Sequence, residues 1–544
     1  MFKRFFLFLV YPILLFSSQE DAVKLAQKTK IYKKNEWKAL LHYDNDFKVT
    51  DKKFLLNKNL SLKSELISTI KSFYDLPSHY KNLNNHPQCR FPARLLFITH
   101  ELNISTNEFP KVNCQDLRIY KEKAPTDKIS LVYASENVTK PSSMMGHVFL
   151  KFSGINKKGL KVNHAITFYT VIETVNPLSL IYQNTISGMK GLFALQPYKI
   201  VKNNYTKKEN RNLWEYQLFL NEYRKKLIYY HVWELKDIDI KYYFTSYNCS
   251  TVIYNLLSLV KPEIYDDKKI WITPLDSVKF LYKYNLIQKA QLYPSNSWLT
   301  KMIEDTNIDE NNTEQLKSKI IDISKYKSPN KIPSERQLNV GYVNLNQEKY
   351  LMLSFLPASH LLNDYNREYF GENELKIASL SILVNKTNIE LQDFTLYGMK
   401  SYMPYSSLMH DLSYQFKLAV KKEYTKNENC DDTLKIDGGI GIDYLLLSDI
   451  NVFALFNGGV GYNKDDNIHL LFNPQIGMMI YEIFNMKSLF YYQPYFINKE
   501  YIYDRYVLQH NIFIHKDYTL YFNLEKIDKR NNFLNYDFGL KYIF

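Results

Sequence analysis

The segment Tyr247-Asn-Cys-Ser250 carries the residue of this 544-residue chain that is best suited to nucleophilic chemistry. Apolar residues follow Cys249 at helical spacing: Val252, Ile253, Leu256, Leu257 and Val260. This spacing predicts a helix that begins at Cys249 and ends before Pro262, because proline disfavours the α conformation for the residue before it. The positive end of a helix dipole lowers the pKa of a thiol, so this position favours the reactive thiolate.

The segment from Asn137 to His147 is a short polar turn that delivers a histidine to the start of an apolar run over residues 148–152. We expect a strand at this run. A histidine that takes the proton of a thiol activates it, so His147 and Cys249 have the parts of a thiol enzyme. A buried structural cysteine and an unrelated histidine are the alternative, because one residue of each type carries little information.

The surrounding pattern predicts the α and β elements that position these residues. Amphipathic helices are expected at residues 37–43 and 60–74, and strands at residues 129–133, 148–152 and 162–171. We expect a helix-like stretch over residues 209–226, and a turn at 271–275 that leads into a short helix at 276–284.

Seven segments between Pro87 and Trp271 resemble one known family: residues 87–94, 142–147, 191–198, 209–216, 231–235, 242–244 and 247–250. In this order they are similar to the Lnb N-terminal periplasmic domain family, which includes a bacterial lipoprotein N-acyltransferase. The resemblance implies a circularly permuted papain-like domain, in which the histidine strand precedes the cysteine helix. The chain departs from the characterised member in one respect, because that member has transmembrane helices after its catalytic domain and this chain has no such run.

In the implied site, Cys249 is the nucleophile and His147 is the base. A third polar group should orient the imidazole, and Asn163 and His164 are the candidates, although strand alternation lets only one of them face the site. The oxyanion or pocket candidates are Asn248, Tyr247 and Ser143, together with the backbone N–H of Cys249. Ser142 and Ser143 fit turn and capping positions better than nucleophile positions. His231 and Trp233 are expected to pack in a core.

The resemblance implies a thiol acyltransferase that moves a fatty acyl group from a phospholipid, through a thioester, to the N-terminal cysteine of a lipoprotein. The alternatives are an exported cysteine hydrolase that acts on cell-envelope peptide or lipid, and an outer-membrane structural protein with a relic site. We expect no cofactor, since no His, Cys or Asp cluster has metal-ligand spacing and no glycine-rich phosphate loop is present. No Lys/Arg cluster is dense enough to indicate nucleic acid, although the net charge of +14 suits anionic lipid.

Export is predicted by the first 18 residues. Lys3 and Arg4 precede an apolar run over residues 5–16, which is too short to span a bilayer and has the length of a secretory signal. In an oxidising compartment we expect Cys89 and Cys114 to form a disulfide. Cys249 would then remain a thiol, and the rival pairing of Cys249 with Cys430 would destroy the nucleophile.

The C-terminal third consists of alternating apolar segments of about ten residues, which predict an antiparallel barrel of roughly ten to twelve strands. The pattern is seen at residues 375–384, 389–397, 412–420, 434–442 and 507–514, with polar turns at 463–466 and 526–530. The last strand alternates to an aromatic terminus at Phe544, which is typical of outer-membrane barrels, and a soluble β-domain is the alternative. The 46 tyrosines fit an aromatic girdle, and an AT-rich genome would also raise their number.

We therefore predict a multidomain α+β protein of the periplasm and outer membrane of a Gram-negative bacterium. The expected parts are a signal peptide (1–18), a helical domain (19–115), a permuted papain-like domain (116–294), a linker (295–335) and a barrel (336–544).

Overall fold

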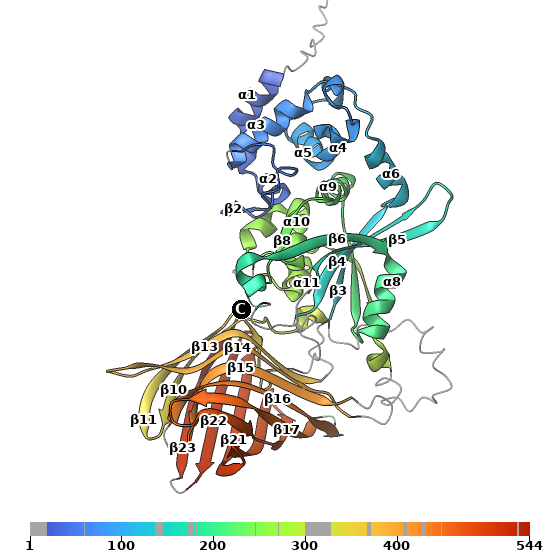
Figure 1. Ribbon diagram of the computed structural model, residues 1–544. Helices are drawn as coiled ribbons and strands as arrows, with labels where there is room; N and C mark the ends of the chain where they lie inside the picture. Colours follow the sequence, from blue (N-terminus) through green and yellow to red (C-terminus); the bar gives the residue numbers. More distant parts are fainter. Residues whose placement is uncertain are drawn as a thin grey trace, which may run out of the picture. The chain divides into compact units, whose positions relative to one another are not determined.

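The structure of the protein is a computed structural model (Figure 1). It describes residues 19–58, 60–135, 145–171, 179, 182–244, 246–269, 271–299, 328–366, 371–405, 411–426, 430–447, 449–529 and 532–544. The expected signal peptide and most of the expected linker lie outside this part of the chain. Among the described helices, none is long and apolar enough to cross a membrane.

The chain divides into two compact units. The first contains residues 1–131, 149–198 and 217–269, and the second contains residues 132–148, 199–216 and 270–544.

The helices of the first unit follow local sequence signals. Ser61 caps α3 by accepting the backbone N–H of Ser64, and proline occupies the first position of α4 and of α5, where no helical N–H is needed. Trp37 is fully buried, and its indole donates to the carbonyl of Leu62. These helices are α1 (Gln19–Thr29), α2 (Asn35–Leu40), α3 (Leu62–Phe73), α4 (Pro87–Arg90), α5 (Pro92–Leu102), α6 (Gln115–Lys123), α9 (Glu222–Glu234) and α10 (Cys249–Val260).

Seven strands form one sheet in the order β8-β6-β5-β4-β3-β7-β9, and β4, β5, β6 and β8 pair with one another antiparallel. Their bounds are β3 (Lys128–Ala134), β4 (His147–Ile155), β5 (Lys161–Thr170), β6 (Met189–Pro197), β7 (Leu213–Leu218), β8 (Ile240–Tyr242) and β9 (Ile287–Tyr293). The prediction of a helix-like stretch over 209–226 is wrong in its first half, where β7 lies. Trp214, Tyr216 and Leu218 alternate into the core at strand period, and the helix starts only at Glu222.

Two α-helices lie in the part of the second unit that the structure describes. They are α8 (Tyr198–Asn203), most of which belongs to this unit, and α11 (Pro274–Lys283), which has the position expected for the short helix. Thr273 and Asp276 form a capping box at the start of α11. Arg336 contacts both carboxylate oxygens of Asp276 at 3.0 Å, and its Nε donates to the carbonyl of Phe544, so the first barrel strand is tied to the end of the chain.

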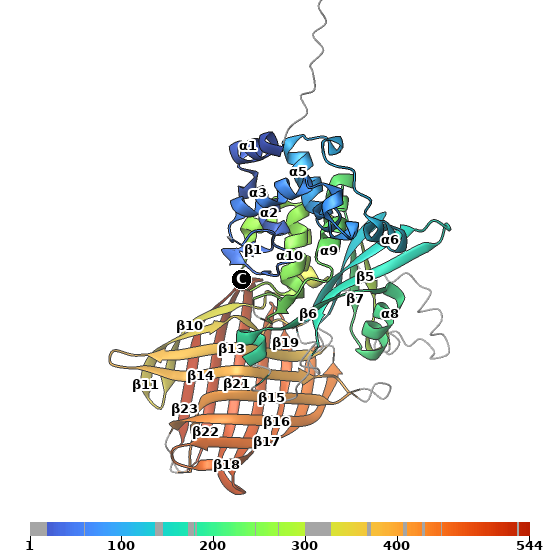
Figure 2. The same cartoon turned by 45° about the horizontal axis from the view of Figure 1, so that its top comes forward.

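The predicted barrel is confirmed, and it is a closed antiparallel barrel with twelve strand positions (Figure 2). Pairing of β11 with β13 and of β10 with β23 closes the ring. The strands are β10 (Gln337–Leu345), β11 (Glu348–Leu356), β12 (Ala358–His360), β13 (Glu372–Val384), β14 (Ile389–Tyr402), β15 (Ser413–Tyr424), β16 (Cys430–Leu447), β17 (Ile450–Asn463), β18 (Asn467–Phe472), β19 (Gln475–Glu482), β20 (Met486–Ile497), β21 (Glu500–His515), β22 (Tyr518–Asp528) and β23 (Phe533–Ile543).

Two strand positions are interrupted by proline. Pro474 lies in the gap between β18 and β19, which pair with β17 in one continuous register. Pro357 likewise separates β11 from β12 along β13. Proline has no N–H to donate to a ladder, so each strand breaks there without losing its place in the ring.

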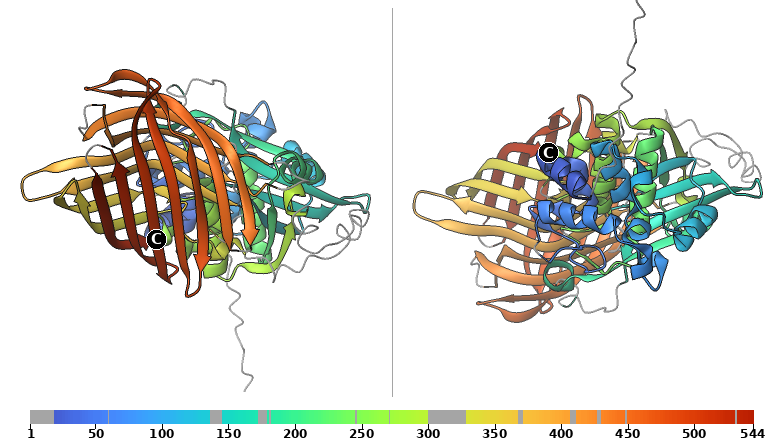
Figure 3. Two further views of the ribbon diagram at one scale, coloured as in Figure 1. Left: turned by 90° about the horizontal axis from the view of Figure 1, so that it is seen from below. Right: turned by 90° about the horizontal axis from the view of Figure 1, so that it is seen from above.

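The faces of the barrel strands differ in chemistry. On β16, Leu434, Ile436 and Ile440 are about half exposed, whereas Lys435 and Asp437 between them are only 5% exposed. The same alternation of exposed and buried side chains runs through β10, β22 and β23. Figure 3, left, shows the barrel strands from below. Closure removes the strand edges and leaves apolar side chains outside with polar ones inside, which is the arrangement of a membrane-spanning barrel.

The segment 361–366, which we call the plug segment, packs into the barrel interior between β12 and β13. Leu362 belongs to a buried cluster with Leu455, Met479 and Leu489. Lys487 of β20 donates to the carbonyls of Leu362 and Asp364 at 2.6 and 3.1 Å, and to the carboxylate of Glu372. Lys541 of β23 contacts the Asp364 carboxylate at 3.0 Å. These buried ionic contacts hold the plug segment in the lumen.

Candidate functional site

Cys249 is the first residue of α10, as the sequence predicts. It is 5% exposed, and its Sγ lies 3.9 Å from the hydroxyl of Ser250. The helix packs against α2, α9 and β5 and is buried on nearly every side, so its N-terminus is held in place from several directions. A thiolate at this position is favoured by the helix dipole.

The side chains of the residues before Cys249 are hydrogen-bonded to other parts of the first unit. The Asn248 side-chain oxygen accepts from the backbone N–H groups of Ser250 and Thr251 at 2.9 and 3.1 Å, and its amide donates to the Phe244 carbonyl. Asn248 therefore acts as the N-cap of α10, and one of the two N–H groups of its amide is used by the Phe244 carbonyl. The Tyr247 hydroxyl is directed to His42 at 2.5 Å, so its side chain is also engaged elsewhere. The backbone N–H of Cys249 stays a candidate, whereas Ser143 lies outside the described residues.

His147 is the first residue of β4 and belongs to the second unit, whereas Cys249 belongs to the first. Gly146 before it has φ +79°, and a Cβ there would lie 2.9 Å from the Ala134 carbonyl oxygen, so the turn into β4 requires glycine. The His147 ring stacks on Tyr205, with centroids 6.2 Å apart. Burial and the positive charge of Arg211 lower the pKa of the His147 imidazole to about 3, which keeps the ring neutral.

The two candidates for orienting His147 are not in a position to do so. As expected, β5 pairs with β4, but Asn163 lies opposite Ser153 and His164 lies opposite Phe152. Phe152 and Ser153 are five and six residues along β4 from His147. At the rise of a strand, this places them about 16–20 Å from His147. Neither side chain can orient the imidazole from there, and this sequence assignment is corrected.

A buried polar network of the first unit, which was not predicted from the sequence, leads to Tyr247. We call Tyr247 and Asn248, the residues just before Cys249, the cysteine loop. His42 Nε2 lies 3.0 Å from His231 Nε2, and His231 Nδ1 lies 3.0 Å from a Glu234 carboxylate oxygen. The other nitrogen of His42 contacts the Tyr247 hydroxyl, two residues before Cys249. His42, His231 and Glu234 are at most 3% exposed. His231 was expected to pack in a core, and it does so as a member of this network.

Burial sets the protonation of the network. Desolvation lowers the pKa of His231 to about 3 and that of His42 well below its ordinary value, with further lowering by Arg94 in both cases. Burial also raises the pKa of Glu234 to about 7, against the opposing effects of Arg94 and two backbone donors. The two histidines are therefore neutral and serve as directional hydrogen-bond links from Glu234 to Tyr247.

Cys89 and Cys114 are joined by a disulfide with Cα atoms 5.2 Å apart, while Cys249 and Cys430 are not disulfide-bonded. The disulfide links α4 to the residue before α6, and the indole of Trp233 donates to the Cys89 carbonyl at 2.8 Å. Among the described residues, no group of three or more His, Cys, Asp or Glu side chains could hold a metal ion.

The fold thus defines a protein with a closed, outer-membrane-type barrel and a mixed α and β region outside it. Residues 116–284 match the Lnb N-terminal periplasmic domain, which confirms the resemblance found in the sequence over this segment. Residues 29–101 match a domain of unknown function (DUF7843), and residues 327–542 match another (DUF7840). The periplasmic domain and the barrel identify an exported protein of the periplasm and outer membrane of a Gram-negative bacterium.

No curated protein matches the chain. Solved structures with some similarity include the KdgM porin, with 9% identity over 38% of this chain and 99% of the porin, and a TM-score of 0.24. The NanC porin shows 8% identity over 38% of this chain and 98% of its own, with a TM-score of 0.26. The outer membrane channel DcaP of Acinetobacter baumannii shows 10% identity over 77% of this chain and 95% of its own, with a TM-score of 0.19.

Proposed function

We propose that the protein is a thiol-dependent acyltransferase that moves a fatty acyl group from a phospholipid to an amine, with the N-terminal cysteine of a lipoprotein as acceptor. The observation that carries the proposal is the place of Cys249, a thiol at the capped N-terminus of a buried helix, inside the segment that matches the Lnb domain. The barrel anchors the enzyme in the membrane that supplies its donor.

The reaction has two displacement steps. His147 takes the proton of the Cys249 thiol, and the thiolate attacks the ester carbonyl carbon of the phospholipid. The C–O bond to glycerol breaks, and the lysophospholipid alcohol leaves with the proton from the imidazolium. The acceptor amine then attacks the thioester, a C–N bond forms, the C–S bond breaks, and His147 takes the amine proton while the Cys249 thiolate returns.

The test is a transfer assay with the full chain reconstituted in phospholipid nanodiscs whose acyl chains are isotopically labelled. The acceptor is a synthetic peptide that begins with a diacylglyceryl-modified cysteine and has an unblocked α-amine. We expect labelled amide on the peptide with the unmodified protein and with Cys430→Ala, which removes the other thiol. Cys249→Ala and His147→Ala should each abolish the product.

The final acceptor distinguishes the enzyme classes. Labelled free fatty acid with no amide would identify a hydrolase that uses water. Full amide formation by Cys249→Ala would overturn the proposal.

A further inference from the structure

A cavity lies beside β6 in the first unit. It differs from an ordinary small-molecule pocket because one wall is the edge of a strand. On the side of β6 away from β5, only β8 pairs with it among the described residues, and this pairing covers Met189 to Gly191 and then stops. The rest of β6, to Pro197, continues to pair with β5 on its other side. Its outer edge therefore presents backbone N–H and C=O groups at strand spacing.

The cavity lies along this edge. Every residue from Gly188 to Leu195 lines it, although successive side chains of a strand point to opposite faces. Lining by consecutive residues is expected when a cavity opens onto the edge of a strand and not onto one face. Leu195 is 44% exposed, and Phe193 is partly buried.

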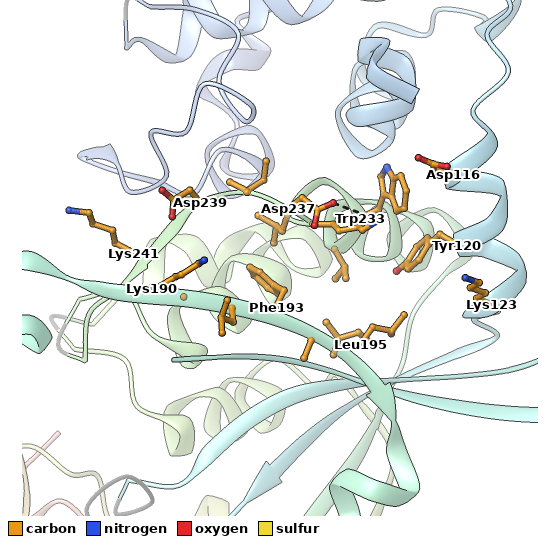
Figure 4. Close-up of a pocket in the computed structure, with 18 of the residues that line it drawn as sticks. Asp116, Tyr120, Lys123, Lys190, Phe193, Leu195, Trp233, Asp237, Asp239 and Lys241 are labelled. Atoms are coloured by element: carbon orange, nitrogen blue, oxygen red, sulfur yellow. Dashed lines mark ion pairs between the residues drawn. The ribbon is translucent and has the colours of Figure 1, made fainter. Parts of the chain in front are cut away.

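The opposite wall is aromatic and helical. Figure 4 shows Phe193 and Leu195 on β6 on one side of the cavity, and Trp233 at the end of α9 and Tyr120 on α6 on the other. Lysines and aspartates lie at both ends of the cavity: Lys190, Lys241 and Asp239 at one, and Lys123 and Asp116 at the other (Figure 4). The cavity volume is about 1150 Å³, larger than the 300–1,000 Å³ usual for small-molecule sites.

We propose that this cavity binds an extended peptide segment, which adds to β6 as an antiparallel or parallel strand beyond the end of β8. An extended peptide is the occupant that satisfies a row of backbone groups, while the apolar wall receives alternate side chains. An unpaired strand edge is otherwise a liability in an exported protein.

Two ring contacts connect the cavity to the cysteine loop, and this connection indicates which peptide would bind. The Phe193 ring contacts Phe168 with centroids 4.7 Å apart, and Phe168 meets the Tyr247 ring edge-on at 6.0 Å. Resting on the proposed function, we assign the peptide to the polypeptide that follows the acceptor cysteine of the lipoprotein substrate.

The test measures peptide binding separately from acyl transfer. Cys249→Ala protein in nanodiscs is titrated with a fluorescent ten-residue peptide of alternating valine and serine, and anisotropy gives the Kd. Two further peptides carry backbone N-methyl groups at the odd or at the even positions. Only every second N–H of an added strand faces β6, so one methylated peptide should lose at least tenfold in affinity and the other should keep most of it.

A matched pair of variants locates the site. Leu195→Glu, in the cavity, should weaken binding at least tenfold, whereas Leu160→Glu should not change it. Leu160 is also an exposed leucine of this sheet region, in the turn before β5, and it does not line the cavity.

Equal binding of the two methylated peptides would show that the cavity takes an apolar chain and not a strand, and would overturn the proposal. Absence of binding, or equal effects of the two glutamate variants, would overturn it as well. Register-dependent binding without acyl transfer would leave the docking site standing and remove the proposed reaction.

Discussion

Replacement of Arg94 should destabilise the first unit more than any surface change, because this guanidinium is fully buried between two carboxylates. Its Nη1 contacts Glu65 at 3.1 Å and its Nε lies 3.7 Å from Glu234. The guanidinium also lies over the rings of Phe54 and Phe91, 4.5 and 4.3 Å from their centroids. Arg94→Leu keeps the apolar bulk but leaves two buried carboxylates without their counter-charge.

Loss of one partner of a buried ion pair typically costs about 3–5 kcal/mol. With a urea dependence of about 2–3 kcal/mol per molar, the midpoint of unfolding should fall by about 1–2.5 M. The assay is tryptophan fluorescence of the full chain in detergent at pH 8. All five tryptophans precede residue 299 and none lies in the barrel, so the signal reports on the region outside it.

The matched control is Arg90→Leu. Arg90 also contacts the Phe91 ring, but it is partly exposed and forms no ion pair with any residue that the structure describes. We expect its midpoint to shift by less than a third of the Arg94→Leu shift. Equal shifts for the two variants would refute the idea that the buried charges of this network stabilise the unit.

Acid should destabilise the same unit. When it unfolds between about pH 6.5 and 4.5, His42 and His231 regain the ordinary pKa of an imidazole and each takes up a proton. Glu234, whose pKa in the folded protein is about 7, releases one proton when it unfolds. The net uptake of about one proton lowers stability by about 1.4 kcal/mol per pH unit as pH falls, and a urea midpoint that does not move between pH 6.5 and 5 would contradict this. Deletion of residues 536–544 removes most of β23, the strand that pairs with both β10 and β22, so heat-dependent gel mobility and membrane assembly should be lost. A truncated protein that still shifts on boiling would argue against a closed barrel. Lys487→Leu removes three contacts to the plug segment and its neighbour Glu372, so single-channel conductance in planar bilayers should rise above that of the unmodified protein, and unchanged conductance would show that the lysine does not hold the lumen closed.

Elements with strong local signals could be predicted from the sequence. The apolar spacing after Cys249 and the proline at 262 define α10 at both ends, and the period-2 segments define the barrel strands. The stretch around Trp214 was misread because its aromatic residues fit either a helix or a strand until the neighbouring strands are known. The polar turn expected at 526–530 begins later, since β22 continues to Asp528.

The site depends on long-range geometry that a single sequence does not contain. Asn163 and His164 were chosen because their strand pairs with the strand of His147, but the register, which decides the distance, follows from packing across the sheet. The link between His42 and His231 joins residues 189 positions apart, and no local pattern indicates it. From the sequence, His231 was expected only to pack in a core, as was Trp233.

In the proposed reaction, Cys249 carries the acyl group between donor and acceptor. The most direct measurement is mass spectrometry of the Cys249 peptide after incubation of the full chain with labelled phospholipid and no acceptor. We expect one acyl chain on Cys249, which neutral hydroxylamine or the acceptor peptide removes and which is absent from the His147→Ala protein. An unmodified Cys249 in a preparation that still acylates the acceptor would contradict it.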